Sequence, residues 1–191
     1  MQGMYYGRMW KIIFIFQMLL IVIISFISRV PRRHAMYCIY LVYLKSMLDS
    51  YNLYWEVDAG TLLGAVRQNS FAGRPTDIDL TMLGYSDDDL IKIFKVNGFM
   101  LRKKLEHRLQ FYGCWNPLMK EHILVDVRTK CVETDSSDMV IRGYSSIYNI
   151  KVPITHNYID RLYTLYGKEW MIPDKNQLSY KQPYNSLITG C

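Results

Sequence analysis

The first strong pattern in the chain is a long apolar run near its start. Residues 12–27 read IIFIFQMLLIVIISFI, with basic side chains before and after the run. A helix of roughly 17–20 apolar residues spans a bilayer, whereas a cleavable signal has an apolar part of about 7–15 residues and a small-residue cleavage site. We therefore predict an uncleaved transmembrane signal anchor at residues 12–28, after a tail at 1–11. A cleaved signal or a buried helix is the alternative reading.

Beyond this run, the apolar positions alternate between helical and strand-like spacing. We expect helices at 36–48, 60–66, 86–98 and 158–165. We expect strands at 54–57, 77–82, 99–101, 109–112 and 123–127. Together these elements predict an α/β (α+β) domain over residues 36–175, in which helices flank a mixed sheet, followed by a tail at 176–191.

Composition narrows the class of protein without identifying it. Half of the 191 residues are hydrophobic and 14% are aromatic, which favours a folded domain over a disordered chain. The formal net charge of +6 suits phosphate-bearing partners, but several basic residues flank the apolar run, and no separate basic, aromatic-rich segment predicts nucleic-acid binding. The four cysteines form no C-x-x-C pair, which argues against a zinc site; free thiols or a Cys114–Cys131 bridge both remain open.

Two carboxylates in the segment Thr76-Asp77-Ile78-Asp79-Leu80 are the leading candidates for chemistry. On a strand, residues separated by one position point to the same face, so Asp77 and Asp79 lie close enough to share a divalent cation. Asp126 interrupts the apolar strand 123–127, where an acid is costly without a partner. We therefore predict that these three aspartates bind Mg²⁺ or Mn²⁺ and are catalytic. A solvated pair at a sheet edge is the alternative for Asp77 and Asp79.

The turn before this strand is a candidate cradle for a phosphate. Gly60 lets the backbone approach a ligand closely, and the amides that begin the following helix, from Thr61 on, attract anions. Arg67, two turns later, suits either a phosphate clamp or a structural ion pair, and Asp58 suits either a structural role in the turn or metal binding. The order of strand, Gly-Thr turn, helix, Asp-x-Asp strand and single-Asp strand is the layout of a nucleotidyltransferase-like active site.

Two blocks of sequence resemble one known family. The segment YWEVDAGTLLGAVR at residues 54–67, followed by Asp77-Ile78-Asp79, resembles the LicD and fukutin-related family. The block YGKEWMIP at residues 166–173 is similar to the C-terminal signature of that family.

The resemblance implies an activity and a location. It implies transfer of a phosphorylated alcohol, such as phosphocholine or ribitol phosphate, from a CDP-linked donor to a hydroxyl of a glycan or glycoprotein. It also implies a type II membrane protein whose catalytic domain lies in the lumen of the Golgi or endoplasmic reticulum. These consequences are expectations from the family alone.

One segment departs from the family pattern. Arg74-Pro75-Thr76 stands where members usually carry Trp-Asp-Asp, and the chain is shorter than typical members. Both features favour the alternative function, a catalytically inactive or accessory homologue that binds a glycan or a partner transferase.

Overall fold

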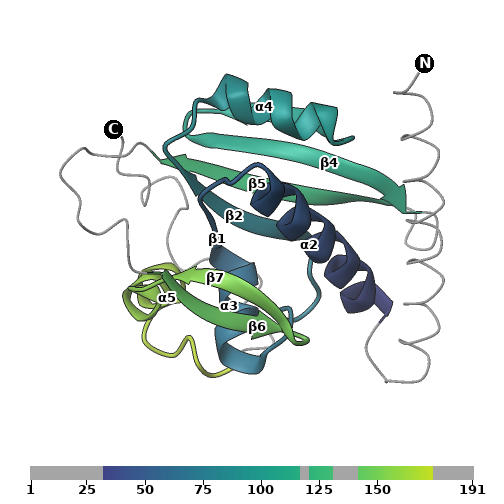
Figure 1. Cartoon of the computed structure of the whole chain (residues 1–191). Coiled ribbons are helices and arrows are strands. Elements are labelled where there is room, and N and C mark those ends of the chain that lie inside the picture. Colours follow the sequence, from purple (N-terminus) through teal and green to yellow (C-terminus); the bar gives the residue numbers. More distant parts are fainter. Residues whose placement is uncertain (1–31, 117–120, 131–141, 174–191) are drawn as a thin grey trace, which may run out of the picture.

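One sheet and its flanking helices make up the part of the protein that a computed structural model describes, residues 32–116, 121–130 and 142–173 (Figure 1). The helices are α2 (Arg32–Ser50), α3 (Ala59–Gln68), α4 (Asp87–Val96) and α5 (Tyr158–Tyr166). The strands are β1 (Trp55–Val57), β2 (Asp77–Leu83), β3 (Met100–Leu105), β4 (Arg108–Asn116), β5 (Glu121–Lys130), β6 (Arg142–Ile147) and β7 (Ile150–Thr155). The predicted mixed α/β architecture is confirmed. The exact bounds of the domain, residues 36–175, stay a prediction.

The seven strands form a mixed sheet in the order β3-β4-β5-β2-β1-β7-β6. The pairs β2–β5 and β1–β7 are parallel, and the other neighbouring pairs are antiparallel. Strand β2 therefore lies between β5 and β1, although 37 residues of sequence lie between Leu83 and Glu121. This arrangement brings residues of β2 and β5 side by side near the middle of the sheet.

One face of the sheet is apolar and is covered by α2 and α4 (Figure 1). Alternate residues of β2, including Ile78 and Leu80, are buried on this face, as strand periodicity predicts. The ring of Phe94 on α4 stacks on Phe111 of β4, with ring centroids 4.2 Å apart. Helix α2 approaches β4 so closely that a Cβ at Gly113 would lie 2.8 Å from the Tyr40 ring.

The opposite face is polar, and α3 and α5 approach it near β1 and β2. Asp79 and Thr81, which alternate with the apolar residues of β2, are buried there. The start of α3 contacts Asp79, and α5 reaches the end of β1 through an ion pair between Arg161 and Asp58. The buried polar side chains are therefore concentrated on the polar face, while the apolar face forms the hydrophobic core.

Sequence periodicity missed the hairpin formed by β6 and β7. Its two-residue turn, Tyr148 and Asn149, has φ values of 47° and 67°. Positive φ at both positions belongs to the type I′ turn that suits a tight hairpin, and asparagine adopts it readily. The alternating Ile150, Val152 and Ile154 after that asparagine are the signal that identifies the second strand.

Several predictions concern segments outside the described residues. These are the tail at 1–11, the signal anchor at 12–28, the tail at 176–191 and Cys131, one half of the possible Cys114–Cys131 bridge. Among residues 32–116, 121–130 and 142–173, no helix has the length and apolar character needed to cross a bilayer.

Candidate metal centre

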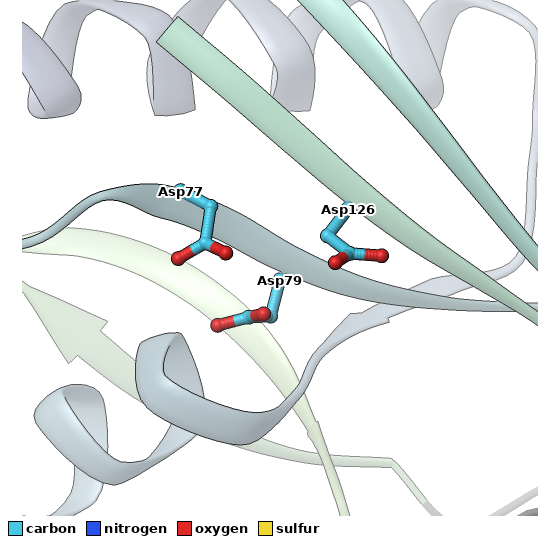
Figure 2. A group of neighbouring side chains, drawn as sticks. All are labelled: Asp77, Asp79 and Asp126. Atoms are coloured by element: carbon cyan, nitrogen blue, oxygen red, sulfur yellow. The ribbon is translucent and has the colours of Figure 1, made fainter. Parts of the chain in front are cut away.

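Three carboxylates meet on the polar face where β2 and β5 run side by side (Figure 2). Asp79 of β2 stands opposite Asp126 of β5 in the parallel register, and Asp77 precedes Asp79 by one full strand period. One oxygen from each side chain lies within 4.8 Å of the others. Hard divalent cations prefer carboxylate oxygens as ligands, so this cluster can hold Mg²⁺ or Mn²⁺. The structure thus brings the three predicted carboxylates together, and their metal-binding and catalytic roles stay a prediction.

Burial and mutual repulsion shift the titration of the two β2 carboxylates. Burial raises the pKa of Asp77, the Thr76 hydroxyl lowers it, and the charge of Asp126 raises it further. Burial raises the pKa of Asp79 well above its ordinary range, and the charges of Asp77 and Asp126 act in the same direction. A cation bound among these groups would stabilise their charged forms.

The start of α3 is built around Asp79. The Thr61 amide donates to Asp79 Oδ2 over 3.2 Å, while the Asp79 amide donates to Thr61 Oγ1 over 2.9 Å. A Cβ at Gly60 would lie 3.3 Å from Asp79 Oδ2, so glycine leaves room beside this carboxylate. The preceding Ala59 has φ of 43°, a left-handed conformation that is strained for alanine. The structure thus brings the predicted Gly60–Thr61 turn to the predicted carboxylates.

Arg67 lies in the last turn of α3. Its Nη1 donates to the backbone carbonyl of Trp170 over 3.3 Å, and burial lowers the pKa of its guanidinium. Seven steps of helix lead from Gly60 to Arg67, a rise of roughly 10 Å along the axis of α3. The hydrogen bond favours a structural role for Arg67 over the predicted phosphate clamp.

Asp58 is held by arginines from two other elements. Arg161 of α5 donates to Oδ1 and Oδ2 over 2.9 and 2.8 Å, and Arg128 of β5 lies 3.3 Å from Oδ2. The Thr81 hydroxyl also donates to Oδ2 over 3.0 Å. These contacts support the structural alternative for Asp58, which ties α5 and β5 to the turn before α3. Sequence reasoning missed both arginines, because nothing in their local pattern marks them.

Asp126 carries a partner that sequence reasoning also missed. Arg108 of β4 donates from Nε to Asp126 Oδ1 over 2.6 Å and also pairs with Oδ2 through Nη2. Gln110 Nε2 donates to Oδ2 over 3.2 Å. We predicted that a lone acid in an apolar strand needs a partner. Strand β4 supplies that partner, and it lies beside the candidate cation site.

Comparisons with known proteins give distant structural matches. No family model and no curated protein matches the chain. The structure of ANT(2")-Ia in complex with adenylyl-2"-tobramycin matches with 17% identity over 61% of this chain and 67% of that chain, at a TM-score of 0.46. The lincosamide antibiotic adenylyltransferase LnuA, bound to lincomycin, matches with 12% identity over 62% and 80%, also at 0.46.

These findings correct the predicted family and what depended on it. The LicD and fukutin-related membership is wrong, because no family model matches the chain. Transfer of a phosphorylated alcohol from a CDP-linked donor to a glycan and the location in the Golgi or endoplasmic reticulum depended on that membership and are wrong with it. The signal anchor at residues 12–28 lies outside the described residues. The first resembling block and the Asp77–Asp79 pair form β1, a turn, most of α3 and two carboxylates on β2. Such residues describe how a cation is held and carry little information about donor, acceptor or compartment.

Proposed function

We propose that this protein is a metal-dependent nucleotidyltransferase, built on a nucleotidyltransferase-like fold. In this reaction an acceptor hydroxyl attacks the α-phosphorus of a nucleoside triphosphate, loses its proton and displaces pyrophosphate. The observation that carries the proposal is the cluster of Asp77, Asp79 and Asp126, whose oxygens lie within 4.8 Å of one another. A divalent cation bound there supplies charge neutralisation for the phosphates of the donor.

The order of elements supports this class of reaction. A strand, the Gly60–Thr61 turn, a helix, the Asp77–Asp79 strand and the Asp126 strand follow one another along the chain, and the register sets Asp79 opposite Asp126. Catalysis of nucleotidyl transfer is mostly positioning and electrostatic stabilisation, so a rigid array of carboxylates on neighbouring strands suits it. We assign the catalytic and metal-binding roles to these three aspartates.

We assign donor binding to the turn before α3. Gly60 leaves space next to Asp79, and the first turn of α3 provides the positive end of the helix dipole. Both features suit a phosphate lying beside a metal-binding carboxylate. Arg67 contributes to this proposal only by fixing the far end of α3 to the Trp170 carbonyl.

The test separates metal binding from nucleotide binding. Mn²⁺ affinity of the full chain is measured by electron paramagnetic resonance, followed by titration with each of the four ribonucleoside triphosphates. We expect Asp77→Asn, Asp79→Asn and Asp126→Asn each to weaken Mn²⁺ binding by at least about tenfold, since each removes a charged ligand. We also expect triphosphate binding to the unaltered protein to require Mn²⁺.

Asp88→Asn is the matched control, because Asp88 is a highly exposed aspartate at the start of α4 that pairs with Lys104. It should leave Mn²⁺ affinity unchanged. Equal Mn²⁺ affinity in the control and in the three cluster variants would refute the proposed site. Nucleotide binding that is independent of Mn²⁺ would refute the proposed reaction.

A further inference from the structure

The guanidinium of Arg108 bonds both oxygens of Asp126 as a two-pronged fork, and this guanidinium fork lies at the edge of the carboxylate cluster. Asp126 is buried, with 2% of its side chain exposed, whereas 23% of the Arg108 side chain remains exposed. Arg108 therefore enters the cluster from the solvent side and covers both oxygens of Asp126. The Arg108 guanidinium thus occupies the two oxygens that a cation at Asp126 would also contact.

The strand register shows that Arg108 pairs with a carboxylate that does not stand directly opposite it. Arg108 stands opposite Arg128 in the β4–β5 pairing, and Gln110 stands opposite Asp126. Arg108 leans along the strand to reach Asp126, while Arg128 pairs with Asp58. Two like charges that face each other across strands are thus each neutralised by a different carboxylate.

A guanidinium fork fits a phosphate as well as it fits a carboxylate. Both partners offer two oxygens to parallel N–H donors, and the arginine charge persists at any physiological pH. A cation bound to Asp126 would neutralise the same carboxylate and repel Arg108, so the two cations compete for one group. A phosphate of the donor would offer the displaced fork a new anionic partner beside the cluster.

We propose that Arg108 is a donor-phosphate ligand that holds Asp126 in the metal-free protein and transfers its fork to the triphosphate when a divalent cation binds. This inference rests on the proposed nucleotidyltransferase function. It assigns to Arg108 two roles with opposite consequences. Arg108 opposes binding of the cation alone, and it favours binding of the triphosphate once the cation is present.

The test uses the Arg108→Gln variant of the full chain and two probes. The first is Mn²⁺ alone, and the second is inorganic triphosphate at saturating Mn²⁺, because its binding does not depend on the base of the donor. We expect R108Q to bind Mn²⁺ about tenfold more tightly or better and to bind triphosphate about tenfold more weakly, the scale of one charge-assisted hydrogen bond.

Lys103→Gln is the matched control for a change in net charge. Lys103 pairs with Gln110 in the β3–β4 register, so it stands in the same cross-strand row as Asp126 but one strand farther away. K103Q removes the same charge as R108Q and should change both affinities less than about threefold. A shift in K103Q equal to that in R108Q would assign the effect to net charge and overturn the inference.

A second variant keeps the inference testable should R108Q fold poorly. Arg108→Lys retains the charge but loses the fork, so triphosphate affinity should fall while Mn²⁺ affinity rises less than in R108Q. Unchanged triphosphate affinity in R108K, or unchanged or weaker Mn²⁺ binding in R108Q, overturns the inference. Such results would leave the proposed function standing if Asp79→Asn still abolished Mn²⁺ binding, whereas the absence of Mn²⁺ binding in the unaltered protein would refute the proposed function itself.

Discussion

Replacement of Asp79 by asparagine should stabilise the metal-free protein. Asp79 is buried beside two other carboxylates, and burial together with their charges raises its pKa well above 3.8. Asparagine has nearly the same shape, and its carbonyl oxygen can still accept from the Thr61 amide and hydroxyl. The substitution therefore removes a buried, repelled charge while keeping the local hydrogen bonds.

The distances between the carboxylates give the size of the effect. At an effective dielectric constant of about 20, two unit charges at the 4.8 Å upper limit for these oxygens repel each other by roughly 3.5 kcal/mol. Partial protonation of Asp79 and the attraction between Arg108 and Asp126 reduce the repulsion energy within the folded state. We therefore expect D79N to raise the free energy of unfolding by about 1–3 kcal/mol, or roughly 2–4 °C in Tm per kcal/mol for a chain of this length.

The assay is urea denaturation in EDTA, followed by tryptophan fluorescence between pH 5 and pH 8. A carboxyl group with a raised folded-state pKa binds more protons in the folded state, so it lowers stability as pH rises above its unfolded value of 3.8. The advantage of D79N should thus grow with pH. Excess Mn²⁺ should reverse the order, because it stabilises only a protein that binds it. Lower stability of D79N in EDTA at every pH would refute the electrostatic reasoning.

Two other substitutions test how the surroundings hold the site. Gly64→Ala should destabilise the protein by roughly 3 kcal/mol in the same urea assay, because a Cβ at that position would lie 2.3 Å from the backbone oxygen of Ser70; stability within about 0.5 kcal/mol of the unaltered protein would contradict this packing. Arg161→Gln should cost about 2–4 kcal/mol, since it leaves buried Asp58 with only part of its charge compensation. Equal stability of R161Q at pH 7 would rule out the ion pair as the tie between α5 and the sheet.

The sequence predicted the elements that carry the carboxylates because short-range rules govern them. Alternation of apolar and polar positions placed Asp77 and Asp79 on one face, and the helix expected at 86–98 is α4, which begins where the Ser86 hydroxyl accepts from the Asp89 amide over 3.2 Å. Each of these features is decided within a few residues of chain. The same rules located Asp126 in a strand, although they could not say which strand would lie beside it.

The partners of the buried acids could not be predicted, because sheet register decides them. Arg108 and Asp126 are 18 positions apart, and Arg161 and Asp58 are 103 positions apart. No local periodicity links such pairs. The wrong family assignment has a related origin, since a turn and an Asp-x-Asp strand describe how a cation is held, whereas substrate contacts come from segments that the motif does not include.

The distribution of positive charge separates the structural acids of this sheet from those suited to a cation. Asp58 receives two guanidinium groups and a hydroxyl, and Asp126 receives one guanidinium group that is partly exposed. Within the described part of the chain, no salt bridge involves Asp77 or Asp79. Buried carboxylates without a cationic partner are costly, and a protein retains them where a bound cation completes the charge balance. The negative charge that no cationic side chain balances is centred on Asp79, so a bound divalent cation should stabilise the protein most at that residue. Cation binding should therefore depend more steeply on Asp79 than on Asp126, because Arg108 already neutralises part of the Asp126 charge.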